Sequence, residues 1–195
     1  CKGKYEIEEQ RDIPPLELSS FIMNKPYYTT EETRRDDLYP LLSQIGYQYG
    51  SGLKVIKKIW KSKNGFLFEL KESEGEDEQD DCFSPWLLDG IFQSALAFEY
   101  LDGKAPPDST LLIPYMIDRL IISGEVRDHC FAFFNHQGNR GKGQDLLAHF
   151  RIYDTSGHGV LLIQGMLFKR VSSRFLAGSF QAPSVGSKAA VMASR

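Results

Sequence analysis

Cysteine is scarce in this sequence: Cys1, Cys82 and Cys130 are the three copies among 195 residues. No two of them stand at the spacing of a metal-ligand pair, and three scattered cysteines imply no disulfide framework. We therefore expect no metal site and a reducing, cytoplasmic environment.

Long apolar runs and a strong excess of charge are also missing. No stretch approaches the roughly 20 apolar residues that cross a bilayer, and we expect no signal peptide. The formal net charge is −3, so the whole molecule has no electrostatic attraction for nucleic acid or an anionic membrane. We expect neither as a partner. The chain begins at a cysteine rather than a methionine, which suggests a piece of something longer, although processing would give the same start.

The length predicts one compact domain with linker at its ends. Residues 1–37 are polar and interrupted by Pro14, Pro15 and Pro26, as in a linker that docks a few apolar side chains. Residues 172–195 are rich in Ser, Ala and Gly, which is typical of a tail or linker. The folded domain is therefore expected at 38–171.

Alternation of apolar and polar residues predicts β-strands in this domain. We expect two strands before residue 84 and about four after residue 101. The predicted ranges are 53–60, 66–70, 111–122, 130–135, 146–153 and 159–168. Glycine-containing turns are expected at Gly65, at GNRGKG (138–143) and at DTSGHG (154–159).

Two helices are predicted among these strands. The first covers 38–45 and ends at Gly46. The second is SPWLLDGIFQSALAFEYL (84–101), with Ser84 as a cap and Pro85 in its first turn. Its apolar residues cover nearly the whole circumference, so it must be buried on all sides. A curved antiparallel sheet around a central helix meets this demand, which predicts an α+β hot-dog fold.

Asp89 and Gln93 stand out in this apolar helix because they lie four residues apart, on one face. A carboxyl group buried without partners often stays protonated near neutral pH and can then donate a proton to a leaving hydroxyl. The amide at the next turn can hold that hydroxyl or orient the acid. The alternative is that Asp89 caps the helix or pairs with a backbone group, and the spacing alone does not decide.

Other candidate sites have structural explanations that are at least as good. The acidic segment 72–81 is typical of a solvated loop rather than a cation site, because like charges in tandem repel each other. The segment 138–143 lacks the lysine-hydroxyl ending of a phosphate loop. The four histidines show no metal or catalytic spacing, and a structural role is favoured for His149. Tyr47 and Tyr49 beside Gly50 fit either a narrow channel or a core.

Four segments in order resemble motifs of the dehydratase domains of modular polyketide synthases. GYQYGSGL (46–53) resembles their GYxYGPxF motif, and SPWLLDGIFQ (84–93) resembles HPxLLDxxxQ, with Asp89 and Gln93 at the polar positions. LIPYMIDRL (112–120) is similar to their LPxxI segment, and the strands up to KRV (169–171) are similar to the usual end of the domain. The opening CKGK also resembles the strand that ends a first hot dog. The resemblance covers about residues 1–171.

The resemblance implies a double hot dog, of which this chain is the second repeat after the end of the first in 1–37. Such domains remove water from a 3-hydroxyacyl thioester carried on the phosphopantetheine arm of an acyl carrier protein, and they bind no cofactor themselves. A histidine of the first repeat takes the α-proton. Asp89 would then be the acid, helped by Gln93, and the acyl tunnel would be lined by Tyr47, Tyr49, Gly50, Leu53 and Pro114. The expected partners are the first repeat and the carrier protein, with a homodimer through the synthase left open.

Three positions depart from the family pattern. Ser84 replaces the histidine before Pro85, Ser51 replaces a proline, and Leu53 replaces a phenylalanine. The histidine motif HxxxGxxxxP is absent from this sequence, so we expect the chain alone to be inactive. The alternative is a non-catalytic or repurposed dehydratase-like domain that acts as an isomerase, a pyran-forming cyclase or a branching element. A free-standing hot-dog thioesterase fits the motif order less well.

Overall fold

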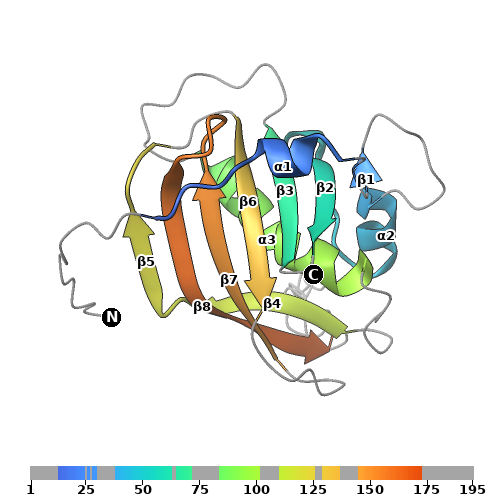
Figure 1. Cartoon of the computed structure of the whole chain (residues 1–195). Coiled ribbons are helices and arrows are strands. Elements are labelled where there is room, and N and C mark those ends of the chain that lie inside the picture. Colours follow the sequence, from blue (N-terminus) through green and yellow to red (C-terminus); the bar gives the residue numbers. More distant parts are fainter. Residues whose placement is uncertain are drawn as a thin grey trace, which may run out of the picture.

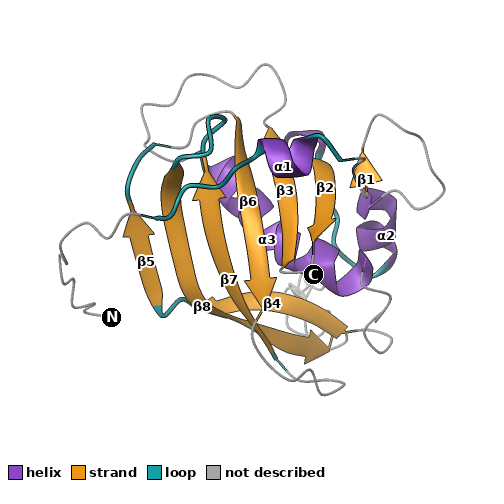
Figure 2. Ribbon diagram, viewed as in Figure 1, coloured by secondary structure: helices purple, strands orange, loops and turns teal. Residues whose placement is uncertain are grey.

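The computed structural model describes residues 13–24, 26, 28–29, 38–62, 65–71, 84–101, 110–125, 129–136 and 145–172. Their antiparallel strands form one curved sheet, and α3 (Pro85–Leu101) lies against its inner face (Figures 1 and 2). The strands are β1 (Tyr28–Thr29), β2 (Ile56–Ser62), β3 (Gly65–Lys71), β4 (Thr110–Met116), β5 (Arg119–Ile122), β6 (His129–His136), β7 (Leu146–Tyr153) and β8 (Gly159–Ser172). The predicted α+β architecture, an antiparallel sheet with a central helix, is confirmed.

The strand order is β1-β2-β3-β6-β7-β8-β4, and β5 pairs with β8 beside this path. The chain leaves the sheet after β3, passes through α3, builds the far edge with β4 and β5, and returns as β6 beside β3. Helix α3 is therefore enclosed by strands that precede it and strands that follow it.

The inner face of the sheet packs on α3 through large aromatic rings. The centroid of the Phe98 ring lies 4.6 Å from that of Phe134 and 5.1 Å from that of Phe66. The residues from Gln93 to Glu99 are all buried, whereas Trp86, Leu88 and Phe92 are only partly buried. The helix is thus buried throughout 93–99, and the expectation of complete burial is wrong for its first two turns.

The predicted start of this helix is confirmed by its capping contacts. The Leu87 N–H donates to Ser84 Oγ at 3.5 Å, and the Leu88 N–H donates to the Ser84 carbonyl at 3.1 Å. The Leu87 N–H, one of the donors that a helix start leaves unpaired, is satisfied by the cap, and the Leu88 bond is the first i→i−4 bond of the helix itself.

The outer face of the sheet is partly covered by residues 13–24. Ile13 and Leu18 are buried there, and α1 (Ser19–Ile22) follows them across the sheet on the side opposite α3 (Figure 1). They join a second apolar cluster that contains Trp60, Leu67, Phe131, Phe133 and Tyr153. The N-terminal segment thus shields apolar side chains that point away from the main core.

Two predicted strands differ from the structure. The strand expected from Leu53 begins at Ile56, because residues 51–53 form the 3-10 turn η1 (Ser51–Leu53). The strand expected at 111–122 is divided into β4 and β5. The division falls opposite Gly165, where a φ of +64° bends β8. The carbonyl of Gly165 accepts a hydrogen bond from the N–H of Asp118, which lies between β4 and β5. The predicted segments 1–4, 72–81 and 138–143 lie outside the described residues, as does the predicted tail 172–195 except for Ser172, which ends β8.

We expect Gly90→Ala to destabilise the domain, because a Cβ at this position would lie 2.3 Å from Val55 Cγ2. Val55 is fully buried and has a short branched side chain, so it has little room to move. The cost of overpacking exceeds the gain in helix propensity, which leaves a net loss of about 1–2 kcal/mol in the free energy of unfolding. Urea denaturation of the chain measures this loss. Gly50→Ala is the control, because its Cβ meets nothing within 4 Å; an equal loss there would contradict the packing argument.

Candidate active site

Asp89 and Gln93 lie one helical turn apart on α3, Asp89 in its first half and Gln93 at its midpoint. Gln93 Nε2 donates a hydrogen bond to Asp89 Oδ2 at 2.7 Å. Gln93 is fully buried, whereas Asp89 is only partly buried, on the part of the helix that the sheet leaves open. The structure therefore pairs the two predicted residues, but it does not enclose the carboxylate as the sequence suggested.

The segment before β2 covers this part of α3. Helix α2 (Leu38–Gln44) supplies Tyr39, whose hydroxyl donates to Gln93 Oε1 at 3.0 Å and accepts from the Ile56 N–H at 3.0 Å. The turn η1 supplies the Leu53 carbonyl, which accepts from Gln93 Nε2 at 2.8 Å. Gln93 is therefore held by three partners.

Tyr39 is the site residue that sequence reasoning missed. It falls inside the predicted helix 38–45 but between the apolar positions that revealed the helix. Periodicity shows which face a residue occupies, not which partner its hydroxyl finds. The available signal was a tyrosine, a residue whose hydroxyl needs a partner when buried, in a helix that had to lie on the core.

Tyr49 completes the surroundings of Asp89. Its ring contacts the ring of Tyr39 edge-on and stacks on the ring of Tyr47, with centroid distances of 5.9 Å and 6.3 Å. Burial raises the pKa of Tyr49, and the nearby Asp89 carboxylate raises it further. Tyr49 is therefore a neutral hydroxyl beside the carboxylate at physiological pH.

Tyr47 attaches the segment after α2 to the start of β4. Its hydroxyl accepts a hydrogen bond from the Leu112 N–H and donates one to the Leu112 carbonyl at 3.0 Å. Burial raises the pKa of Tyr47 to about 12. This hydroxyl thus serves as a structural clamp between the 45–50 segment and the sheet edge.

The remaining predicted tunnel residues are Gly50, Leu53 and Pro114. Gly50 is exposed at the start of η1, and Leu53 reaches Gln93 through its backbone carbonyl. Pro114 is exposed on β4, opposite Phe168 at a shift of register. The tunnel assignment of all five residues stays a prediction.

The histidines with described side chains have structural partners. His149 Nδ1 accepts from the Gly165 N–H at 3.2 Å, and His129 Nε2 lies 3.1 Å from Glu69 Oε1. Within the described ranges, no group of three or more His, Cys, Asp or Glu side chains could hold a metal ion. No helix in the same part of the chain has the length and apolarity to cross a membrane.

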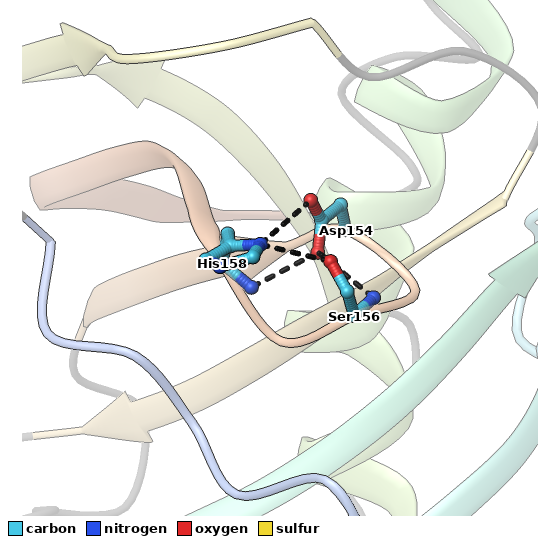
Figure 3. Close-up of polar contacts among 3 residues, drawn as sticks. All are labelled: Asp154, Ser156 and His158. Atoms are coloured by element: carbon cyan, nitrogen blue, oxygen red, sulfur yellow. Dashed lines mark hydrogen bonds and ion pairs between the residues drawn. The ribbon is translucent and has the colours of Figure 1, made fainter.

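A turn between β7 and β8 brings together Asp154, Ser156 and His158, the residue types of a hydrolytic triad (Figure 3). Ser156 Oγ lies 2.7 Å from Asp154 Oδ1 and 2.9 Å from His158 Nδ1, and the same Nδ1 lies 3.5 Å from Asp154 Oδ2. A triad needs the two ring nitrogens of histidine to serve different partners. Here Nδ1 of His158 faces both Ser156 and Asp154. The three residues lie on an exposed turn, so the cluster stabilises the turn.

Comparison with known proteins identifies the family. Residues 24–176 match the family model described as PS-DH, the polyketide synthase dehydratase N-terminal domain. The chain belongs to the polyketide synthase dehydratase family. The description names the N-terminal domain, so it does not support our expectation that this chain is the second repeat, nor the acid role expected for Asp89.

Relatives of this dehydratase chain are large synthases and dehydratase domains. Polyketide synthase PksN of Bacillus subtilis (strain 168) is 24% identical over 185 residues, which cover 94% of this chain and 3% of that protein. The dehydratase domain from the CurJ module of curacin polyketide synthase superposes with a TM-score of 0.69 at 18% identity, over 86% of this chain and 56% of that one. A trans-AT polyketide synthase dehydratase domain from Brevibacillus brevis superposes with a TM-score of 0.65 at 17% identity, over 83% of this chain and 55% of that one.

These structural matches show the hot-dog fold, and this chain spans about half the length of the solved dehydratase domains. It spans only a few per cent of the synthases. The predicted family and fold are thus confirmed, whereas the position of this repeat within the family's double fold is not.

We expect the Tyr47 clamp to weaken at high pH. The folded-state pKa of about 12 lies above the ordinary value of 10.0, so the folded chain holds this proton more tightly than the unfolded chain does. Its contribution to stability is complete below pH 10 and is lost as pH rises toward 12. Unfolding by urea between pH 8 and 11 should show a steeper decline in wild type than in Tyr47→Phe. Tyr115→Phe removes an exposed hydroxyl and should keep the wild-type slope; a slope that Tyr47→Phe leaves unchanged would contradict the assignment.

Proposed function

We propose that this chain is the acid-bearing hot dog of a polyketide synthase dehydratase that removes water from a 3-hydroxyacyl thioester on an acyl carrier protein. The observation that carries the proposal is the hydrogen bond from buried Gln93 to Asp89 at the open part of α3. A carboxyl group that a substrate can reach, and whose carboxylate form is stabilised by a fixed donor as the proton leaves, can act as a general acid.

The reaction needs one base and one acid. A base outside this chain removes the α-proton of the substrate, and the electrons of that C–H bond form the new C=C bond. The C–O bond to the β-hydroxyl breaks, Asp89 gives its proton to the departing oxygen, and water leaves. The product is an α,β-enoyl thioester on the carrier protein, and Asp89 is left as a carboxylate that must recover a proton before the next cycle.

The contacts of Gln93 favour this role for Asp89. The amide N–H at 2.7 Å from Oδ2 stabilises the negative charge that forms as the proton departs. The neutral ring of Tyr49 borders the same carboxylate, and burial keeps its hydroxyl protonated by raising its pKa. Neither contact requires a metal or a cofactor, and the phosphopantetheine arm would arrive with the substrate.

The finer assignment as the second repeat rests on these two residues, although the matching family model is described as the N-terminal domain. The sequence lacks the HxxxGxxxxP pattern of the histidine-bearing repeat and carries the DxxxQ pair. The structure places that pair on the central helix, one turn apart and hydrogen-bonded. We therefore propose that the other repeat supplies the base.

The edge of the sheet offers a place for that other repeat. Among the described strands, β4 and β5 pair only with β8, so they form an edge. The edge carries exposed apolar side chains at Tyr115, Met116, Ile117, Leu120 and Ile122. An exposed apolar edge strand favours pairing with another chain or domain. Because the chain spans about half of the solved dehydratase domains, we propose that the other repeat covers this edge.

We expect Asp89→Asn to remove dehydration activity in the intact dehydratase that contains this chain. Asparagine keeps the shape and hydrogen bonding of aspartate but has no proton to give, and loss of a general acid typically costs on the order of 10²–10⁴ in rate. Mass spectrometry of a 3-hydroxyacyl carrier-protein substrate measures the loss of one water.

Glu17→Gln is the matched control, because it neutralises an exposed carboxylate just before α1, away from both α3 and the β4–β5 edge. Residues 1–195 alone should be inactive, since the base is missing. Full activity of Asp89→Asn, or turnover by the isolated chain, would overturn the two-residue mechanism and favour an isomerase, cyclase or branching role.

Leu120→Lys should weaken association between this chain and a separately produced upstream repeat. Leu120 is 49% exposed on β5, and a lysine there would place a charge inside an apolar interface. Co-elution of the two repeats in size-exclusion chromatography measures the association. Leu147→Lys changes a similarly exposed leucine on β7 and should leave it intact; equal loss in both variants would argue against the β4–β5 edge.

A further inference from the structure

Tyr39 connects the main chain of β2 to the proposed acid through Gln93. The Ile56 N–H donates to the Tyr39 hydroxyl, which donates to Gln93 Oε1, both at 3.0 Å. Gln93 Nε2 then donates to Asp89 Oδ2 at 2.7 Å. Tyr39 and Gln93 are both buried, so water does not compete freely for these groups.

The direction of each hydrogen bond follows from the main-chain groups at the two ends. The Leu53 carbonyl can only accept, so the side of the Gln93 amide that faces it must be the NH₂ group. The Ile56 N–H can only donate, so the Tyr39 oxygen accepts it and its single proton points to Gln93 Oε1. A flipped Gln93 amide would place oxygen against oxygen at Leu53 and nitrogen against a donor at Tyr39.

We propose that Tyr39 is a positioning residue that fixes the Gln93 amide with its NH₂ toward Asp89, so that Asp89 donates its proton from Oδ1. This inference rests on the proposed function of Asp89. It adds a residue to the site and assigns separate tasks to the two carboxyl oxygens.

The two oxygens of a protonated Asp89 differ in their hydrogen-bonding roles. A neutral carboxyl group has one carbonyl oxygen, which accepts, and one hydroxyl oxygen, which carries the proton. A fixed donor at Oδ2 favours the carbonyl form there and places the proton on Oδ1. When the proton passes to the leaving hydroxyl and the C–O bond breaks, charge spreads to Oδ2, and the bond from Gln93 becomes charge-assisted and stronger. Gln93 therefore stabilises the carboxylate more than the acid.

The orientation can be measured on the chain itself by NMR of the Gln93 side-chain amide. In wild type, its protons should exchange with solvent at least about 100-fold more slowly than those of exposed Gln48, because the Gln93 side chain is fully buried and its NH₂ group donates to both Leu53 and Asp89. Tyr39→Phe should speed the exchange about tenfold. Tyr153→Phe removes another buried tyrosine hydroxyl, in the outer-face cluster, and should change nothing at Gln93.

The role in catalysis is tested by a double-mutant cycle in the intact dehydratase. Tyr39→Phe should lower kcat on the order of tenfold with little change in KM, because buried Tyr39 acts on Asp89 through Gln93. Gln93→Met should lower kcat further. The double variant should be no slower than Gln93→Met alone, since Tyr39 acts through Gln93.

The outcomes separate this inference from the proposed function. Activity retained in Asp89→Asn would overturn the proposed function, while the NMR measurement would still judge the amide orientation. Fully additive losses in the cycle would overturn the positioning role and leave Tyr39 as a packing residue. Should Tyr39→Phe fail to fold, rapid exchange of Gln93 in wild type would overturn the inference and slow exchange would support it.

Discussion

A helix can be enclosed by apolar side chains only if each polar group that it carries finds a partner, and α3 carries several. Ser94 Oγ donates back to the Gly90 carbonyl at 3.0 Å, so it is satisfied within the helix. Glu99 is 3% exposed and pairs with Arg170 of β8 at 2.6 Å. Gln93 is satisfied by the segment that precedes β2. Because an unpaired buried polar group costs roughly 1–3 kcal/mol, these pairings determine which parts of the chain must lie on the helix.

The two long-range pairings attach the middle and the last turns of the helix to different parts of the fold. Glu99 holds the last turns of α3 against the end of β8, whereas Gln93 holds α2 and η1 over the first turns. The first turns are also where the apolar cover is incomplete, since Trp86, Leu88 and Phe92 stay partly accessible. Asp89 lies in this opening. The same requirement that buries the amide thus holds the carboxylate at the boundary between core and solvent, where a substrate could reach it.

Much of this arrangement follows from local sequence pattern. The apolar circumference of residues 84–101, with Ser84 and Pro85 at its start, predicts the buried helix, and the alternation in 130–135, 146–153 and 159–168 predicts the strands around it. The parts that could not be predicted depend on contacts distant in sequence. The turn η1 faces Gln93 across 40 residues, and the break between β4 and β5 depends on the bend at Gly165. Tyr39 reaches Gln93 across 54 residues, a partnership that no periodicity contains.

The hydrogen bonds of Gln93 also bear on which half of a dehydratase this chain represents. The distinction between acid-bearing and base-bearing repeats depends on one or two polar side chains on the central helix. Here those side chains are an aspartate and a glutamine whose donor and acceptor directions are fixed by the Leu53 carbonyl and the Ile56 N–H. An amide locked as a donor toward a carboxyl group suits an acid that becomes negatively charged as it reacts. It would give no such help to a histidine base that becomes positively charged, and this asymmetry favours the acid-bearing assignment.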